Sequence, residues 1–445
     1  MEQVSGNNNN PVTGVSKPRS FAAGILTGVL ITTLIAGTVL GGFLQFGKGS
    51  SGGLAATGLL GNLVNRKNSA VNDESIEKLR GLERIINEYY YEPENISVDD
   101  LETGLYKGLF KALGDPYTEY YTKEETEELE KALVGYYYGI GAYISQDQVS
   151  GYPMISGVIK NTPAEEAGLL ADDIIYSVND ESAAGMSLDE VVSRVRGEAG
   201  TTVHLTIYRE GESDYLEFDV ERRKVDSPSI ESEVMEDDIG YIQISEFTEV
   251  SAGQFDEALA ELYSQNIKGL VIDLRNNPGG DVDAVTSIAN KLLPEGIVFY
   301  MEDKDNKRIT YKCDGKNEIK IPLVLLVNGN SASASEILSG AVKDSGIGTI
   351  LGTQTYGKGV VQTMYSLNDG STVKITTADY YTRNGNNINK IGIEPDLVVE
   401  FDGEAYREDG TDNQLDSALG EIRKALAESA TEKKADKADK ADKAD

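Results

Sequence analysis

The stretch IPLVLLVNGNSASASEILSGAVKDSG, residues 321–346, joins an apolar run to a helical pattern through a short polar turn. Such an apolar run predicts a strand that is buried on both faces. An earlier stretch, IKGLVIDLRNNPGGDVDAVTSIANKLLP, residues 267–294, has the same order with a Pro-Gly-Gly turn. Strands that alternate with helices predict an α/β fold, in which functional residues gather at the carboxyl ends of the strands. Both turns lie at such an end.

Three serines, Ser331, Ser333 and Ser335, occupy alternate positions in the later turn. One interpretation is structural, because Ser333 and Glu336 fit the S-x-x-E capping box that closes the first turn of a helix. The other is catalytic, because the unpaired N–H groups and the dipole at a helix start stabilise an oxyanion beside a nucleophilic serine. The turn alone leaves both interpretations open.

A nucleophilic serine needs a base, and the chain offers one histidine, His204, and one cysteine, Cys313. His204 lies in the alternating pattern TTVHLTIYR, residues 201–209, so we expect it on a sheet. A Ser-His-Asp triad, a histidine-built metal site and a Cys-based zinc site are therefore disfavoured. The base would come from Lys, Asp, Glu or Tyr.

Lys358 is the candidate base, because it lies between Gly357 and Gly359 and precedes an apolar, strand-like run. Close packing there would desolvate the amine and lower its pKa. An extended strand would place Lys358, Val360 and Gln362 on one face, so that the Gln362 amide could orient the amine. The alternative is an ordinary solvated loop lysine.

The same residues partly match a nucleotide-binding loop. GTQTYGKG, residues 352–359, fits G-x-x-x-x-G-K, and Asp273 could complete an ATPase. However, Gly359 stands where Ser or Thr is required, and the following VVQTMYSL predicts a strand rather than a helix. We therefore disfavour an ATPase.

The N-terminal part predicts a membrane anchor. A polar tail at 1–20 precedes an uncharged run at 21–46 that is long enough to span a bilayer, and 47–72 has the composition of a linker. Basic residues before the run favour a cytoplasmic N-terminus, which would place the rest outside the cytoplasm. A cleaved signal peptide is the alternative.

The remaining regions flank the α/β part. Residues 73–134 are predicted to be helical, 403–430 to be a C-terminal helical region, and the KAD repeat at 431–445 to be disordered. The first region carries one apolar stripe, formed by Ile76, Leu79, Leu82, Ile85 and Ile86. With 41 basic against 74 acidic residues, the net charge of −33 argues against a nucleic-acid partner.

Residues 135–224 alternate short strands with one or two helices in an order that resembles a PDZ domain. Its loop, Gly139, Ile140, Gly141 and Ala142, can turn successive N–H groups toward a terminal carboxylate, while the next strand adds a peptide by edge pairing. A glycine-containing hairpin without a ligand is the alternative. Arg194 and Arg196, near a predicted helix end, are hypothesised to couple this domain to its neighbour.

Together, the motifs resemble those of the carboxyl-terminal processing (tail-specific) peptidases, in the order of that family and over about residues 73–400. The motifs are GDPYTEYY (114–121), DLRNNPGG (273–280), NGNSASASEI (328–337), GTQTYGKGVVQ (352–362) and IGIEPD (391–396). The resemblance implies that Ser333 is the nucleophile, Lys358 the general base and Gln362 its positioning partner. It also implies an oxyanion hole from the N–H groups of Ala334 and Gly279, or Gly280.

The resemblance further implies a crotonase/ClpP-like ββα protease core, at 225–402, with the PDZ domain inserted before it. The function expected is a membrane-anchored serine endopeptidase that recognises substrate C-termini and cleaves nearby bonds without ATP or metal. Members of the family are commonly dimers, so we expect a homodimer. The alternative is a catalytically inactive PDZ scaffold that only binds peptides.

Overall fold

The computed structural model describes residues 69–147 and 150–442. The predicted tail at 1–20, the predicted anchor at 21–46 and most of the linker at 47–72 lie outside these residues. Among the helices of the described ranges, none combines the length and the apolar character needed to cross a membrane.

The N-terminal region is mainly helical, as its pattern predicts, and also contains a short strand. Its elements are α2 (Asp73–Tyr89), η2 (Pro93–Asn95), α3 (Val98–Lys111), β1 (Glu119–Tyr121) and α4 (Lys123–Val134). Asn72, Ser97 and Thr122 cap the three α-helices by accepting N–H groups of the first turn. Strand β1 pairs with β18 (Thr372–Thr382), which is too distant in sequence for a local pattern to reveal.

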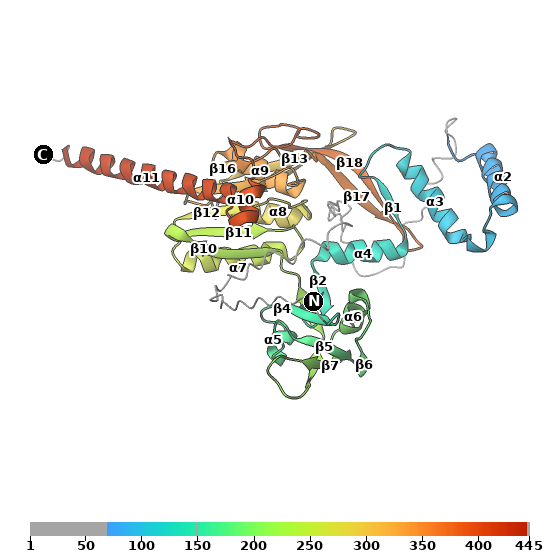
Figure 1. Cartoon of the computed structure of the whole chain (residues 1–445). Helices are drawn as coiled ribbons and strands as arrows, with labels where there is room; N and C mark the ends of the chain where they lie inside the picture. The colour runs from blue at the N-terminus through green and yellow to red at the C-terminus, as the bar shows by residue number, and fades with distance from the viewer. Residues whose placement is uncertain (1–68, 148–149, 443–445) are drawn as a thin grey trace, which may run out of the picture. The chain divides into compact units, whose positions relative to one another are not determined.

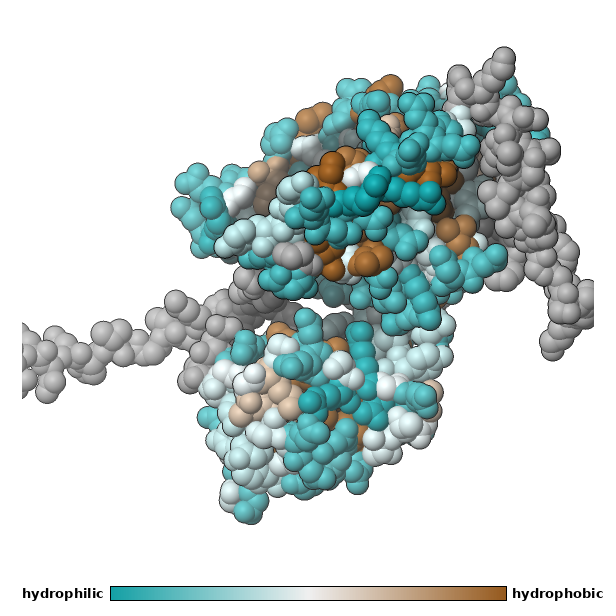
Figure 2. Space-filling model, turned by 90° about the vertical axis from the view of Figure 1, so that its right-hand side faces the viewer, coloured by the Kyte–Doolittle hydropathy of each residue, from teal (hydrophilic) through white to brown (hydrophobic). Residues whose placement is uncertain are grey.

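The apolar stripe predicted for α2 is exposed. Ile76, Leu79, Leu82 and Ile85 are 36%, 42%, 48% and 55% exposed, and α2 has no buried residue in the described chain. Figure 2 looks at this side of the molecule and shows apolar side chains at the surface among hydrophilic ones. The stripe is therefore available to a partner.

The PDZ-like region is a small antiparallel sheet with two helices. Its elements are β3 (Ala142–Gln146), β4 (Pro153–Val158), α5 (Pro163–Ala167), β5 (Ile174–Val178), β6 (Glu181–Ser182), α6 (Leu188–Val195), β7 (Thr202–Tyr208) and β8 (Leu216–Glu221). The sheet order is β3-β4-β5-β7-β8, with β6 beside β5. Strands β2 (Tyr136–Gly139) and β9 (Arg223–Asp226) pair where the region begins and ends. His204 lies on β7, as predicted, with Nδ1 2.8 Å from Oδ1 of Asp219.

The predicted buried strands form a six-stranded sheet. In spatial order they are β10 (Ile230–Met235), β11 (Ile239–Ile244), β12 (Gly269–Asp273), β15 (Leu323–Val327), β16 (Thr349–Gly352) and β19 (Leu397–Val398). All neighbours are parallel except the pair β10 and β11. The continuous apolar runs result from burial on both faces, because Leu270 and Ile272 pack in one core and Val271 in another.

Helices cover both faces of this sheet (Figure 1). The helices that do so are α7 (Ser251–Ser264), α8 (Val282–Ala289), α9 (Ala334–Ser345) and α11 (Asn413–Asp442). Two short helices, η3 (Glu236–Asp238) and α10 (Gly403–Asp409), lie between β10 and β11 and before α11. Side chains of α7, α8 and α9 share a core with one face, while Ala418, Leu419 and Ile422 of α11 pack on the other. The carboxyl ends of β12 and β15 therefore meet at one edge of the sheet.

A second sheet lies beside the first and carries the other half of the site. It contains β13 (Gly296–Asp303), β14 (Arg308–Cys313) and β17 (Val360–Ser366). The order is β1-β18-β13-β14, and β17 pairs with β18. The strand predicted after Gly359 is thus present as β17, which also removes the helix that a nucleotide-binding loop requires.

The prediction of disorder at 431–445 is wrong over most of its length, because α11 continues to Asp442. The KAD repeat has no apolar face, which is why we expected it to lack structure. Alanine and lysine are strong helix formers, and the repeat places Asp four residues before Lys, as at Asp436 and Lys440. Local helix propensity therefore extends the packed part of α11.

Candidate active site

Ser333 lies at the carboxyl end of β15, immediately before α9, and is 4% exposed. Its φ of 53° and ψ of −111° are unusual for a residue other than glycine, whereas an ordinary cap is extended. The Tyr380 hydroxyl donates to its carbonyl at 3.2 Å, which helps to hold this conformation. The serine is more constrained than a simple helix cap.

Lys358 is the candidate base, and it is 1% exposed. Burial, helped by the positive charge of Lys374, lowers the pKa of the Lys358 ammonium to about 7. The nearby carboxylates of Glu336 and Asp115 oppose this shift. The solvated-loop alternative is therefore wrong, because the structure buries the side chain.

Glu336 links the two candidate residues, although the sequence suggested only a capping residue. Its Oε2 accepts the backbone N–H of Ser333 at 2.9 Å and that of Lys358 at 2.8 Å. Its Oε1 accepts the Thr355 hydroxyl at 2.6 Å and the Gly357 N–H at 2.7 Å. Burial raises the pKa of Glu336, while these four donors favour the ionised form.

The sequence contains one signal for this role, the spacing of Glu336 three residues after Ser333. That spacing predicts the bond to the Ser333 N–H, which is present. It cannot predict the bonds to residues 355–358, because they depend on how β16 and the following loop return to α9. Glu336 is fully buried as a result.

Gln362 lies on β17 of the second sheet, four residues after Lys358, and is buried. The register shifts between Val361 and Gln362 where β17 pairs with β18, and both residues are buried. The common face predicted for Lys358, Val360 and Gln362 stays a prediction, because the extra residue at this irregularity is Thr377 of β18 and not a residue of β17. The Gln362 amide nitrogen donates to Oγ1 of Thr376 at 3.2 Å.

The Pro-Gly-Gly turn approaches Ser333 closely. A Cβ on Gly279, which has a φ of 103°, would lie 2.7 Å from Cβ of Ser333 and 2.9 Å from the Ala334 nitrogen. Only glycine fits there. The Gly279 N–H already donates to Oδ1 of Asn277 at 2.8 Å, so an oxyanion would have to replace that acceptor.

Two other N–H groups belong to the predicted oxyanion hole. Ala334 is the first residue of α9, so its N–H has no acceptor within the helix. Gly280 has a φ of 137°, and a Cβ there would lie 1.9 Å from the Phe247 carbonyl oxygen. The glycine-rich turn is therefore fixed tightly between β11 and α9.

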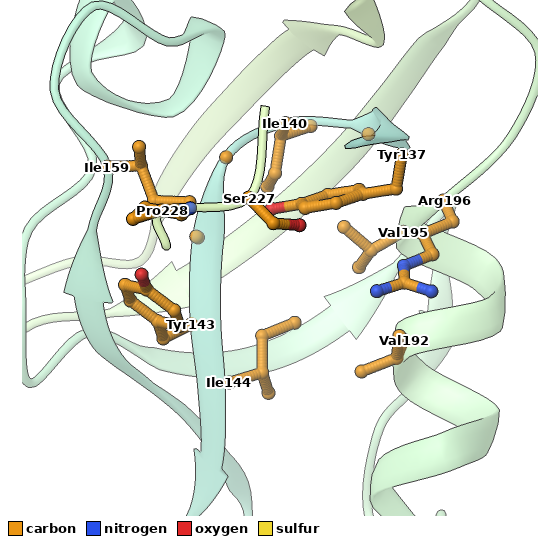
Figure 3. A pocket seen from close by; sticks show the side chains of 13 residues that line it. Tyr137, Ile140, Tyr143, Ile144, Ile159, Val192, Val195, Arg196, Ser227 and Pro228 are labelled. Atoms are coloured by element: carbon orange, nitrogen blue, oxygen red, sulfur yellow. The ribbon is translucent and has the colours of Figure 1, made fainter. Parts of the chain in front are cut away.

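The predicted PDZ loop lines a pocket of about 290 Å³ between β3 and α6 (Figure 3). Gly139, Ile140, Gly141 and Ala142 all contribute to it, so the structure brings the four predicted residues together. The remaining lining residues are Tyr137, Tyr143, Ile144, Ile159, Val192, Val195, Arg196, Ser227 and Pro228. The pocket is mainly apolar, with its open backbone loop at one end.

The two arginines proposed as coupling residues differ in their positions. Arg194 pairs with Glu181 of the same domain, which gives no support for a contact with the protease core. The Arg196 guanidinium lies 4.6 Å from the ring centroid of Tyr137 and lines the pocket. Figure 3 shows the Arg196 guanidinium between Val195 and Val192, at the side of the pocket formed by α6.

Comparison with known proteins gives the family. Residues 238–399 match the model of peptidase family S41, and residues 154–209 match a PDZ domain. The carboxy-terminal processing protease CtpA of Bacillus subtilis (strain 168) is 33% identical over 342 residues, which cover 76% of this chain and 72% of that protein. The chain belongs to the S41 carboxy-terminal processing proteases.

Two further proteins are similar to this chain. A probable CtpA-like serine protease of Staphylococcus aureus (strain MRSA252) is 36% identical over 76% of this chain and 68% of its own. The solved structure of the photosystem II D1 C-terminal processing protease is 31% identical, with a TM-score of 0.41, and covers 74% of this chain and 94% of that one. The matches to the two family models and the similarity to CtpA confirm the predicted family, an S41 protease with a PDZ domain.

Within this S41 protease, the geometry suits acyl transfer. A constrained serine at a helix start, a buried lysine with a pKa of about 7 and a glycine-rich turn lie in one region. A lysine with such a pKa is partly neutral at physiological pH and can accept a proton. No cluster of three or more His, Cys, Asp or Glu side chains that could hold a metal occurs in the described ranges.

Proposed function

We propose that this S41 protease is a membrane-anchored endopeptidase that binds substrate C-termini at its PDZ domain and cleaves nearby bonds with Ser333 and Lys358. The observation that carries the proposal is the Glu336 carboxylate, which ties the backbone of Ser333 to that of Lys358. Burial keeps the lysine partly neutral near pH 7. A scaffold that only binds peptides would have no need for a neutral buried amine.

In the proposed reaction, neutral Lys358 takes the proton from the Ser333 hydroxyl as its oxygen attacks the substrate carbonyl carbon. The tetrahedral intermediate collapses when the carbon–nitrogen bond breaks, and the lysine ammonium protonates the leaving amine. Water then attacks the acyl-enzyme, with Lys358 again as base, to release the acid and restore the serine. Gln362 orients the amine.

The proposed oxyanion hole uses the N–H of Ala334, at the start of α9, and one N–H from the glycine turn. Gly279 is the predicted donor, and Gly280 is the alternative. Because the Gly279 N–H donates to Asn277, substrate binding must turn that peptide unit or recruit Gly280. Either donor would face the developing negative charge, where such bonds contribute most to catalysis.

The PDZ pocket supports recognition of an apolar C-terminus. Val192 and Val195 of α6 and Ile144 of β3 form the apolar wall, and the 139–142 loop presents the backbone. A peptide would add to the edge of β3, which pairs only with β4 in its sheet as described. The terminal carboxylate would meet the loop.

The experiment compares the full-length protein with Ser333→Ala and Lys358→Ala, using an unstructured protein with a free apolar C-terminus as substrate. We expect cleavage by the wild type and loss of at least about a thousandfold in either variant, with folding retained. Equal cleavage by all three would contradict the mechanism. Peptide binding without any cleavage would favour the inactive PDZ scaffold.

Membrane attachment and the homodimer belong to the same proposal. The uncharged run at 21–46 supports a single-pass anchor with the protease outside the cytoplasm. The exposed apolar stripe of α2 supports a homodimer. A topology reporter fused after residue 72 tests the anchor, and a cytoplasmic signal there would contradict it.

A further inference from the structure

The Gly-Asp-Pro-Tyr-Thr turn, residues 114–118, precedes the PDZ domain in sequence but packs against the protease core. Strand β1 follows it and pairs with β18, with Tyr120 opposite Val373. The Thr376 N–H of β18 also donates to the Thr118 hydroxyl at 3.0 Å. The turn is therefore fixed to the strand beside β17, which carries Gln362.

Tyr117 lies over the Lys358 amine. The Lys358 Nζ is 4.7 Å from the centroid of the Tyr117 ring, within the range of a cation–π contact. The Tyr117 hydroxyl interacts with Tyr356, two residues before the lysine. Burial and this interaction raise the pKa of Tyr117, so the phenol stays neutral and acts as a cover rather than as a charged partner.

A second contact chain runs from the same turn to Gln362. The Asp115 carboxylate accepts the Thr118 hydroxyl at 2.6 Å and the Tyr117 N–H at 3.0 Å. It also interacts with the Thr376 side chain, whose Oγ1 accepts the Gln362 amide at 3.2 Å. The turn at residues 114–118 thus contacts Lys358 through Tyr117 and is linked to Gln362 through Asp115 and Thr376.

We propose that Tyr117 is a positioning residue that covers Lys358 against water, and that Asp115 orients Gln362 through Thr376. This inference rests on the proposed Ser333 and Lys358 chemistry. It gives the upstream turn a role in the protease site, even though the PDZ domain separates the two in sequence. The turn is then part of the catalytic environment rather than a connection between helices.

The electrostatic surroundings of Lys358 show why a cover matters. Glu336 on α9 and Asp115 favour the charged amine, and the face of the Tyr117 ring does so as well. Lys374 on β18 opposes them, but burial is the largest influence on the pKa of Lys358. Removal of the ring admits water, so its loss as a cover outweighs its loss as a cation partner.

The test measures kcat/KM against pH from 5.5 to 9.5 for the full-length protein, using a fluorogenic unstructured peptide with a free apolar C-terminus. In Tyr117→Ala we expect the midpoint of the acid limb to move up by about one pH unit, with a roughly tenfold loss at pH 6.5 that recovers by pH 9. Tyr117→Phe keeps both the bulky cover and the ring face and should retain the wild-type midpoint.

Tyr120→Ala is the matched control, because Tyr120 lies on β1 but contacts Tyr106 instead of the lysine. It should leave the midpoint unchanged. Asp115→Asn should lower kcat without raising the midpoint, because it weakens the chain to Gln362 and removes a negative charge near Lys358. An unchanged kcat in this variant would overturn the role of Asp115.

If folded Tyr117→Ala kept the wild-type midpoint of the acid limb, the proposal that Tyr117 covers Lys358 against water would be overturned. If melting curves show that Tyr117→Ala is unfolded, Tyr117→Val is measured in its place. A smaller upward shift of the acid-limb midpoint would support the role of Tyr117 as a cover, and an unchanged midpoint would overturn it. If Ser333→Ala cleaved the peptide as fast as the wild type, that result would instead contradict the proposed function. The two failures are therefore distinguishable.

Discussion

The backbone N–H groups of Ser333 and Lys358 share one acceptor atom, Oε2 of Glu336, at 2.9 and 2.8 Å. Ser333 lies in the loop after β15 and Lys358 in the loop between β16 and β17, so no local segment of chain fixes their separation. The buried Glu336 carboxylate, which accepts both N–H groups, fixes that separation instead. The relative position of the proposed nucleophile and base depends on a residue that itself has no role in proton transfer.

Glu336→Gln should reduce kcat by roughly ten- to a hundredfold with little change in KM. An amide keeps the shape but presents an NH₂ group to one pair of donors, so two buried donors lose their acceptor. We also expect the free energy of unfolding to fall by about 2 kcal/mol. Steady-state kinetics and urea denaturation measure the two effects.

Asp344→Asn is the matched control for Glu336→Gln. Asp344 lies on the same helix and accepts the Thr382 hydroxyl at 2.6 Å and the Asn384 N–H at 2.8 Å. Asp344→Asn should lower the free energy of unfolding but leave kcat unchanged. Equal effects of the two variants on kcat would mean that Glu336 acts only through the stability of α9.

Lys358→Met should make the protein more stable near neutral pH while it abolishes the proposed base. The folded pKa of about 7 lies below the ordinary 10.5. Between these values the unfolded chain binds a proton that the folded protein does not, so the free energy of unfolding rises with pH. Below pH 7 the wild type carries the full free-energy cost of burying the charged Lys358 amine. The variant should gain on the order of 3 kcal/mol at pH 7.

Urea denaturation at pH 7 and at pH 10 tests this prediction, since the gain should shrink toward zero at the higher pH. Lys268→Met is the control, because Lys268 is exposed and pairs with Asp238. Stability of Lys358→Met at or below the wild-type value at pH 7 would show that the lysine is not desolvated. A gain that does not depend on pH would point to packing alone.

The sequence allowed prediction of the residues at the carboxyl ends of β12 and β15, because apolar runs and turn residues are local signals. Ser333 and Gly279 are close in the structure for that reason. The family resemblance supplied the roles of Lys358 and Gln362. Their common face was expected from alternation along a strand, and the register shift between β17 and β18 does not test it, because the extra residue lies in β18.

Contacts between distant segments could not be predicted from local patterns. Tyr117 precedes the PDZ domain, and its contact with Lys358 depends on the pairing of β1 with β18. Glu336 looked like an ordinary capping residue for the same reason. In both cases the information lies in tertiary packing, which a pattern of neighbouring residues does not contain.

Leu82→Glu combined with Leu79→Glu should dissociate the proposed homodimer. Both side chains lie on the exposed apolar stripe of α2, and a buried, unpaired carboxylate is costly in an interface. Analytical ultracentrifugation should show a dimer for the wild type and a monomer for the variant. Glu77→Lys, on the opposite face of the same helix, should remain dimeric, and a monomeric wild type would contradict the proposal.

Gly141→Ala should weaken the binding of a peptide with a free apolar C-terminus by at least about tenfold. Gly141 has a φ of 86°, and an added Cβ would lie 2.3 Å from Thr162, so the loop would have to move away from α5. Gly185→Ala is the control, because it has a φ of 77° in the same domain and its Cβ meets no atom within 4 Å. Both variants carry the same backbone strain, and only the first disturbs the loop.

Calorimetry with the peptide acid and its C-terminal amide should show that the wild type prefers the acid and that Gly141→Ala loses this preference. Equal binding of acid and amide by the wild type would mean that the loop does not receive a carboxylate.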